Sequence, residues 1–346
     1  MTEGRVQEFL RERGLRGSLL PMAGDASDRS FLRLGGEGAV LMVRRDPFVA
    51  ARDPFCAATA LLAACGVRVP RILATDGRRG LVLVEDCGDD LVSKLLPGLA
   101  APQIESLYER ALAILLALQR GTFRLRPGVP ADAERLGPER LEWELLFFHR
   151  FWIVESRKCP LAPDEERTLR LFYRALAREV WLALPPVLCH RDYHARNLLV
   201  REGELVVVDH QDARWGPPLY DLASLARDPY VTLPEGIEER LLEGWARSRG
   251  LAPEAIRPAY ERTALQRNLK AAGTYAFQIA ARGRELYRPS LAPTLAQARR
   301  ALVALHACET HARALAVLES RGLLEAPEHA PGGEAAPGYQ QDQFVR

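Results

Sequence analysis

The residue types that could do chemistry in this chain gather in one short stretch, His190-Arg191-Asp192-Tyr193-His194-Ala195-Arg196-Asn197. An apolar run follows, and a second one, Val206–Val208, ends at Asp209. A carboxylate can orient or deprotonate a hydroxyl, and an amide with a second carboxylate can hold a divalent cation. We expect the two runs to pair as strands, so that Asp192, Asn197 and Asp209 converge from adjacent strand ends.

The spacing of these residues matches a motif of protein kinases. Those enzymes use His-Arg-Asp, an Asn five residues after the Asp, and a later metal-binding Asp at a strand end. A lone His-Arg-Asp triplet would more often be a surface turn, and Asp209 alone a strand cap. Because the triplet, the Asn and the strand-end Asp occur together, we favour phosphoryl transfer.

Composition is typical of a folded, soluble protein of one large or two moderate domains. The 346 residues are 48% apolar and 27% charged, with a net charge of +2. This charge is too small to indicate a nucleic-acid partner, and we find neither a membrane-spanning apolar run nor a secretory segment. We therefore expect a cytoplasmic protein that contacts no membrane, and the sequence leaves its oligomeric state open.

The cysteines are scattered along the chain without any C-x-x-C pair. This distribution argues against a zinc site and against a disulfide framework, and favours reduced, mostly buried thiols. The six are Cys56, Cys65, Cys87, Cys159, Cys189 and Cys308.

Hydrophobic periodicity predicts a β-rich first part and a helical second part. A first helix precedes strands at 17–22, 30–34, 39–45, 71–74 and 81–85, with a helix at 52–65 between the third and fourth. After a hinge at 87–90, helices are expected at 101–121, 138–158, 163–181, 220–227, 235–249, 253–284 and 291–318. We place the domains at 1–87 and 88–324, and expect residues 325–346 to be a disordered tail.

In its local motifs the sequence resembles the aminoglycoside phosphotransferase superfamily, and within it the bacterial kinases that phosphorylate the anomeric hydroxyl of N-acetylmuramate and N-acetylglucosamine in cell-wall recycling. The similarity runs from about residue 19 to about residue 287. It is carried by Gly24-Asp25-Ala26-Ser27-Asp28-Arg29, by Asp209-His210-Gln211-Asp212-Ala213, by Trp215-Gly216-Pro217-Pro218-Leu219-Tyr220-Asp221-Leu222, and by Arg267-Asn268-Leu269-Lys270-Ala271-Ala272-Gly273-Thr274-Tyr275.

The resemblance implies an α+β, protein-kinase-like fold of two lobes, with a small β-rich N-terminal lobe and a large helical C-terminal lobe. It implies ATP and Mg²⁺ as cofactors, Asp192 as the catalytic base, and Asn197 and Asp209 as metal ligands. Adenine would lie against 84–87, at the backbone of Glu85 and Cys87. Small residues would let backbone N–H groups approach the phosphates at Gly24, Asp25, Ala26 and Ser27, unless this hairpin is only structural.

The sequence departs from the kinase pattern on the third strand. Arg44 stands where protein kinases place a Lys that pairs with a Glu of the next helix. Arg44 either holds phosphate or is a solvated strand residue, with Arg45 or nothing in its place. The aligned helix position is Phe55, and we expect Asp53 to be an N-cap ahead of Pro54.

Several polar residues flank the chemistry and could contact an acetylated sugar. Gln211 and Asp212 are the better candidates. His194 could equally brace the loop, and Arg196 could meet the carboxylate of muramate or reach solvent. Glu144 could present a carboxylate beside aromatic rings, although most of those aromatics are expected in the core.

Two other functions stay open from the sequence. One is a kinase of an aminoglycoside, an amino alcohol or another small alcohol, which the basic segments 282–284 and 299–300 disfavour for a polycationic acceptor. The other is a nucleotide-binding pseudokinase, suggested by the missing strand Lys and opposed by the retained base and metal ligands. The preferred amino sugar, the anomer and the choice of ATP over GTP are not determined by the sequence.

Overall fold

The computed structural model describes residues 2–22, 29–125 and 135–326. The expected phosphate hairpin at Gly24–Ser27 and nearly all of the expected tail at 325–346 lie outside these residues, so both remain predictions. The chain forms two compact units, unit 1 of Met1–Pro127 and His190–Ala213, and unit 2 of Gly128–Cys189 and Arg214–Arg346. The boundary expected at residue 87 also remains a prediction, because these units are divided by contacts and not by a single cut.

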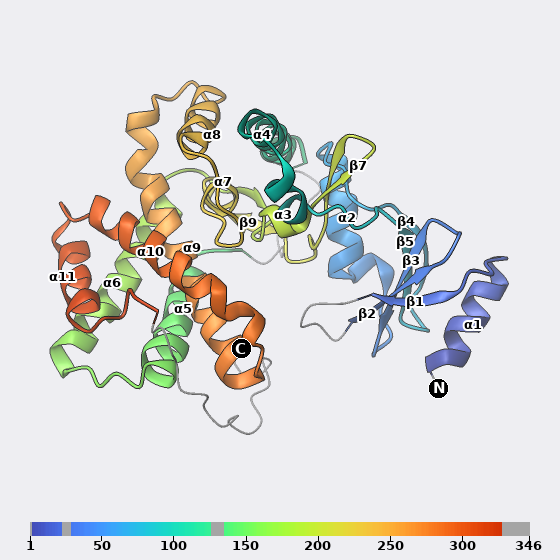
Figure 1. The fold of residues 1–346 in the computed structure, drawn as a ribbon, viewed down its shortest axis with the longest axis horizontal. Helices are drawn as coiled ribbons and strands as arrows, with labels where there is room; N and C mark the ends of the chain where they lie inside the picture. The colour runs from blue at the N-terminus through green and yellow to red at the C-terminus, as the bar shows by residue number, and fades with distance from the viewer. Residues whose placement is uncertain (1, 23–28, 126–134, 327–346) are drawn as a thin grey trace. The chain divides into compact units, whose positions relative to one another are not determined.

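Unit 1 is built on a five-stranded antiparallel sheet in the order β1-β2-β3-β5-β4 (Figure 1). Its strands are β1 (Leu19–Met22), β2 (Arg29–Leu34), β3 (Ala39–Arg44), β4 (Ile72–Asp76) and β5 (Leu81–Glu85). Each neighbouring pair is antiparallel. The five strands confirm the N-terminal part of the expected fold.

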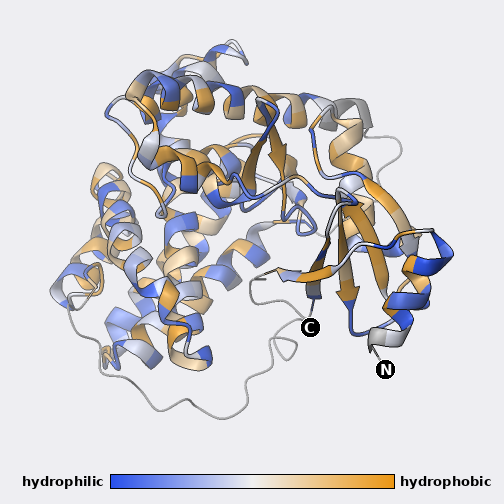
Figure 2. Cartoon of the chain, turned by 45° about the vertical axis from the view of Figure 1, so that its right-hand side comes forward, coloured by the Kyte–Doolittle hydropathy of each residue, from blue (hydrophilic) through white to orange (hydrophobic). Residues whose placement is uncertain are grey.

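Alternating apolar residues let this sheet bury both faces. Successive side chains of a strand point to opposite faces. Leu41 and Leu83 therefore pack with Phe9 of helix α1 (Thr2–Glu12), while Met42 and Val84 pack with residues of helix α2 (Pro54–Ala64). Figure 2 shows the apolar colouring that runs along these strands.

The rest of unit 1 joins the sheet to the predicted catalytic stretch. The short elements are η1 (Ala50–Arg52), α3 (Val92–Leu95), η2 (Leu96–Gly98) and η4 (Ala195–Asn197), and the long helix is α4 (Ala101–Leu125). Strands β7 (Leu198–Arg201) and β8 (Glu204–Val207) form an antiparallel hairpin. Cys87, Leu199 and Val206 are buried together, so this hairpin packs against the segment that follows β5.

Unit 2 is helical and is organised around the long helix α9 (Pro253–Arg282), which packs against α5, α6, α7, α8 and α10. Its other elements are α5 (Pro138–Phe148), η3 (His149–Ser156), α6 (Pro163–Leu182), β6 (Val187–Cys189), β9 (Arg214–Gly216), α7 (Tyr220–Ala226), α8 (Ile237–Arg247), η5 (Glu285–Tyr287), α10 (Arg288–Ala304) and α11 (Glu309–Ser320). A Cβ at Gly273 would lie 2.5 Å from Cα of Phe148. Glycine is therefore required for this close approach of α9 to α5.

Two of the expected helices were wrong in detail. The stretch 138–158 is not one α-helix, because it turns into the π-helix η3 at His149. The stretch 291–318 is two helices, α10 and α11, with Cys308 in an extended conformation before the second. No Gly or Pro stands at this break, so the residues that usually mark a helix end gave no signal.

The fold class is confirmed, with an antiparallel sheet in one part of the chain and helices in the other. Among the residues that the structure describes, no helix combines the length and apolar character needed to cross a bilayer.

Candidate active site

The β7–β8 hairpin brings the predicted catalytic residues together within unit 1. The loop carrying Asp192 enters β7 through η4, and Asp209 follows two residues after β8. The backbone N–H of Val208 donates to the carbonyl of Asn197 at 3.0 Å, which continues the ladder by one step. Asn197 and Asp209 therefore stand at the ends of paired strands, as the sequence predicted.

Buried side chains hold the loop in place. His190 Nε2 donates to the carbonyl of Val208 at 2.9 Å, and the Tyr193 hydroxyl donates to the carbonyl of Ala111 on α4 at 2.8 Å. The backbone is left-handed at Arg191, with φ of 77°, and at Asp209, with φ of 59°. Such conformations cost free energy in residues other than Gly and cluster at functional sites.

Asn197 is oriented by its own loop. Its side-chain Nδ2 donates to the backbone carbonyl of Asp192 at 2.9 Å. The amide nitrogen is thereby occupied, so Oδ1 is the atom that can act as a ligand. An amide oxygen and a carboxylate are the donors that Mg²⁺ takes from proteins, so the pair Asn197 and Asp209 fits this ion.

The Asp209 carboxylate lies among other negative charges. Although its side chain is accessible to solvent, desolvation by the surrounding protein raises its pKa. A hydrogen bond from Gln211 Nε2, at 2.7 Å to Oδ1, lowers the pKa, while the carboxylates of Asp192 and Asp212 raise it. A divalent cation would offset this repulsion.

Arg44 is not the solvated strand residue that one interpretation expected. Its guanidinium forms a two-pronged ion pair with Asp53, in which Nη2 lies 2.9 Å from Oδ1 and Nη1 contacts Oδ2. The Asp53 side chain is 1% exposed and also accepts from the backbone N–H of Cys56 at 3.0 Å. The expected N-cap is confirmed, and the same carboxylate is also the partner of Arg44, a role that the sequence alone did not favour.

Arg29 is a second cation at this place that the sequence analysis did not assign. It lies directly opposite Arg44 in the β2–β3 register. Desolvation and the charge of Arg44 lower the pKa of Arg29, while Asp212, Asp209 and Asp53 raise it. A register drawn for the β2–β3 hairpin would have placed the two arginines side by side.

His210 and Thr59 were also missed. His210 is fully buried, and its Nε2 lies 2.7 Å from Oγ1 of Thr59 on α2. Its ring is tilted by 30° to that of Phe55, with centroids 5.1 Å apart. Because the Thr59 hydroxyl donates to the carbonyl of Phe55 at 2.7 Å, we infer that Nε2 donates to Thr59. Burial lowers the pKa of His210 to about 3, so the imidazole is neutral.

The segment expected to contact adenine is anchored through Glu85. Its carboxylate lies 2.6 Å from Arg68, 3.1 Å from Arg71 and 3.1 Å from Arg201, and the hydrogen bond from Arg68 helps to lower its pKa to about 2. The N–H of Glu85 donates to the carbonyl of Arg71 at 2.9 Å. Any contact of Glu85 with adenine would therefore use its backbone carbonyl. The Cys87 thiol is buried.

The candidate substrate residues occupy different settings. Near the loop, His194 is buried, Arg196 is half-buried and Asp212 is exposed, while Gln211 is engaged with Asp209. Glu144 lies in unit 2, where it is 2% exposed and accepts from Gln266 Nε2 at 3.0 Å. This placement favours a packing role for Glu144.

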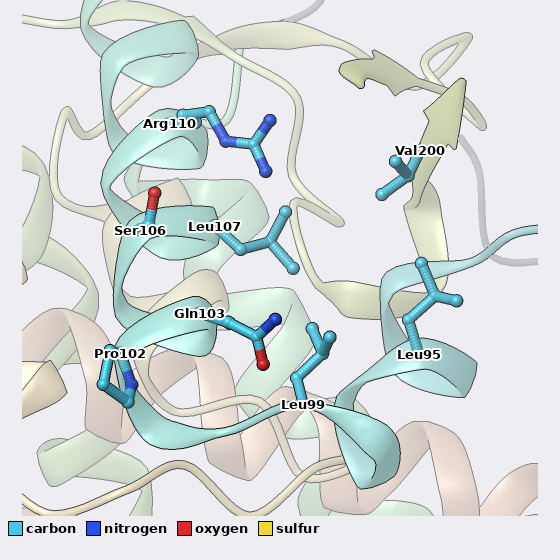
Figure 3. A pocket seen from close by; sticks show the side chains of 8 residues that line it. All are labelled: Leu95, Leu99, Pro102, Gln103, Ser106, Leu107, Arg110 and Val200. Atoms are coloured by element: carbon cyan, nitrogen blue, oxygen red, sulfur yellow. The ribbon is translucent and has the colours of Figure 1, made fainter. Parts of the chain in front are cut away.

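A groove of about 450 Å³ lies elsewhere in unit 1, between α3, α4 and β7 (Figure 3). Leu95, Leu99, Pro102, Gln103, Ser106, Leu107, Arg110 and Val200 line it. It contains none of the residues predicted for the base or the metal, so we assign it no part in the chemistry.

The loop and hairpin carry the residue types that phosphoryl transfer needs, and a comparison with protein families agrees. A family model described as "Phosphotransferase enzyme family" matches residues 18–265. The chain belongs to the phosphotransferase enzyme family. The matched range includes Arg29, Arg44, Asp192, Asn197 and Asp209. The expected superfamily is thereby confirmed.

Relatives within this phosphotransferase family carry a more specific name. The chain is 33% identical over 267 residues to the N-acetylmuramate/N-acetylglucosamine kinase of Pseudomonas aeruginosa, covering 75% of this chain and 76% of the relative. It is 32% identical over 271 residues to the protein of the same name from Pseudomonas putida, with the same coverage. Among solved structures, the fold is similar to ADP-bound aminoglycoside phosphotransferase APH(2'')-Ib, with a TM-score of 0.59 and 15% identity, covering 85% of this chain and 97% of that one.

Proposed function

We propose that this phosphotransferase is a cytoplasmic, ATP- and Mg²⁺-dependent kinase that phosphorylates the anomeric hydroxyl of N-acetylmuramate or N-acetylglucosamine in cell-wall recycling. The observation that carries the proposal is the convergence of Asp192, Asn197 and Asp209 on one loop and hairpin. The name shared by the relatives supports the choice of acceptor.

Asp192 is the residue that we assign to the acceptor. Its carboxylate would take the proton of the anomeric hydroxyl while the sugar oxygen bonds to the γ-phosphorus and the bond to the ADP oxygen breaks. The backbone around Asp192 is fixed by the hydrogen bonds of Asn197 and Tyr193, and this supports the assignment because it limits where the carboxylate can lie.

Asn197 Oδ1 and Asp209 would hold Mg²⁺, which would neutralise charge on the phosphates. Gln211 positions the Asp209 carboxylate through its hydrogen bond. We therefore move Gln211 from the candidate sugar contacts to the support of Asp209, and keep His194, Arg196 and Asp212 as candidates for the sugar.

Arg44 and Arg29 are the cations that we assign to the nucleotide phosphates. Asp53 holds the Arg44 guanidinium by its two nitrogens, so the pair takes the place of the Lys and Glu of protein kinases. Arginine suits this task because its charge is permanent and its planar fork matches both carboxylate and phosphate oxygens. An intact ion pair here argues against a degraded, inactive site.

The test is ADP release with ATP and Mg²⁺ against N-acetylmuramate, N-acetylglucosamine, kanamycin, choline and no acceptor, followed by ³¹P NMR of the product. We expect turnover with the acetylated sugars alone and a sugar 1-phosphate signal. Asp209→Asn should abolish it, whereas Asp164→Asn, an exposed carboxylate on α6, should not. Turnover only with choline or kanamycin would contradict the proposed amino-sugar acceptor. Nucleotide binding without turnover on any acceptor would contradict the proposed kinase activity.

A further inference from the structure

A cluster of three different ligand types lies in unit 2. Glu179 comes from α6, Cys308 is the residue that precedes α11, and His311 lies in the first turn of α11. One carboxylate oxygen, the thiol sulfur and one ring nitrogen all lie within 4.8 Å of one another.

The polar atoms of this cluster are poorly satisfied by the protein. His311 is fully buried, and within the described part of the chain neither ring nitrogen makes a well-formed hydrogen bond. Its Nε2 lies 3.3 Å from Glu179 Oε2, which also faces Arg262 Nε at 2.9 Å, but neither contact has the geometry of a well-formed hydrogen bond. Buried polar atoms in folded proteins nearly always have a partner, so a histidine in this state calls for an explanation.

The setting fixes the histidine in this position. The imidazole packs edge-on against Phe172 of α6, with ring centroids 5.5 Å apart. Ala314 and Leu318 of α11 are buried in the same core as Phe172. The ring therefore cannot turn to solvent unless α11 leaves α6.

We propose that Glu179, Cys308 and His311 bind a divalent transition-metal ion, with Zn²⁺ as the best fit. Thiolate, imidazole and carboxylate are the ligands that Zn²⁺ takes, and three protein ligands leave one position for water. Cys308 is half-buried, which leaves a route for the ion and for that water. Metal–ligand distances of about 2.0 to 2.3 Å require the three atoms to draw closer by about 1 Å.

Arg262 carries a positive charge that competes with the proposed metal ion for Glu179, so its removal gives a variant with the opposite expected effect on metal binding. Its Nε lies 2.9 Å from Glu179 Oε2, and its side chain is 29% exposed. A bound cation would share Glu179 with this guanidinium. Arg262→Gln removes the competing charge and should tighten metal binding, whereas loss of any of the three ligands should weaken it.

The absence of C-x-x-C pairs argued against a zinc site. The cluster instead joins Cys308-x-x-His311 to a carboxylate 129 positions before the cysteine in the chain. The unexpected break between α10 and α11 is what places Cys308 at the start of α11. A metal here would tie α11 to α6.

The experiment titrates the metal-free full chain with Co²⁺ and follows the absorption band of a cobalt–thiolate bond, then displaces Co²⁺ with Zn²⁺. We expect one equivalent to bind and the melting temperature to rise with Zn²⁺ concentration. Cys308→Ser should remove the thiolate band, and His311→Gln and Glu179→Gln should each weaken binding by at least about 10-fold. Arg262→Gln should strengthen it.

The matched control is Cys159→Ser, since Cys159 is also half-buried but lies outside the cluster. It should keep the full band. Because His311→Gln can unfold α11, a second readout uses the unmodified chain, in which Zn²⁺ should slow iodoacetamide alkylation of Cys308 and not of Cys159. A thiolate band that survives in Cys308→Ser, or alkylation of Cys308 unaffected by Zn²⁺, would overturn the proposal.

Discussion

Asp53 performs two tasks with one carboxylate. It caps α2 through the N–H of Cys56 and it pairs with the guanidinium of Arg44. A strand residue that would hold phosphate is thus tied to the first turn of the helix behind it. Arg can therefore replace Lys as the cation proposed to hold phosphate. Its acidic partner is the N-cap residue of α2, where the short side chain of Asp reaches the guanidinium.

Arg44→Met should lower both stability and nucleotide affinity. The Asp53 carboxylate would remain buried without its cationic partner, which costs about 3 kcal/mol of the free energy of unfolding. Urea unfolding and the KM for ATP measure the two effects. Arg44→Lys should recover only part of each, because an ammonium cannot contact both carboxylate oxygens in the same way.

Arg45→Met is the matched control, since Arg45 is the exposed residue that follows Arg44 just after β3. It should change neither quantity appreciably. A larger effect from Arg45→Met than from Arg44→Met would mean that Arg45 holds the phosphate.

Asp192→Asn should reduce kcat by about 10²- to 10⁴-fold, the usual contribution of a general base. The dissociation constant for ATP should stay the same, because Asp192 is assigned to the acceptor. Steady-state ADP release measures kcat, and a nucleotide titration measures the dissociation constant for ATP. A weakened ATP complex with unchanged kcat would contradict the assignment.

At the scale of elements, α2 contacts both the arginine that we propose for the phosphates and the segment that we propose for the metal ion. Its cap, Asp53, holds Arg44, and Thr59 further along the helix binds His210, the residue after Asp209. A shift of α2 would therefore move both groups. The helix is a positioning element even though none of its residues is assigned to a substrate.

Thr59→Val tests this link with a side chain of the same shape. It leaves His210 Nε2 buried without an acceptor, so the free energy of unfolding should fall by about 1 to 3 kcal/mol and the Mg²⁺ concentration for half-maximal activity should rise. His210→Phe alone should lower the free energy of unfolding by a similar amount. In the double variant both polar groups are gone, so its loss should be smaller than the sum of the single losses. Strict additivity would contradict the link.

At the scale of the whole molecule, the chain passes between its two compact units more than once, because unit 1 consists of 1–127 and 190–213. Glu85 is one place where the two segments of unit 1 meet. Its carboxylate binds Arg68 and Arg71 from the first segment and Arg201 from the second.

Acid should weaken this junction in a defined pH range. The hydrogen bond from Arg68 helps to hold the pKa of Glu85 at about 2 in the folded chain, against 4.5 for an unperturbed glutamate side chain. A lowered folded-state pKa adds stability above pH 4.5 that is lost as the pH falls toward 2. Urea unfolding of wild type and Glu85→Gln should differ by about 2 kcal/mol near pH 6, after allowance for the exposure of Arg71.

This difference should shrink progressively below pH 4.5. Glu109→Gln, which removes an exposed carboxylate from α4, is the control and should leave the free energy of unfolding at pH 6 close to that of wild type. A gap between wild type and Glu85→Gln that stays constant from pH 6 to pH 2.5 would contradict the prediction.

The sequence by itself determined the strands of the sheet, most of the helices and the placement of Asp192, Asn197 and Asp209 on one loop and hairpin. These follow from period-2 and period-3.6 patterns and from spacing along one loop and hairpin, which are local properties of the chain. Only the tertiary structure decided the partner of Arg44, the neighbour of His210, the burial of Glu144 and the meeting of Glu179 with Cys308 and His311. Each of these depends on packing between elements distant in sequence, and no local pattern encodes which side chains such packing brings into contact.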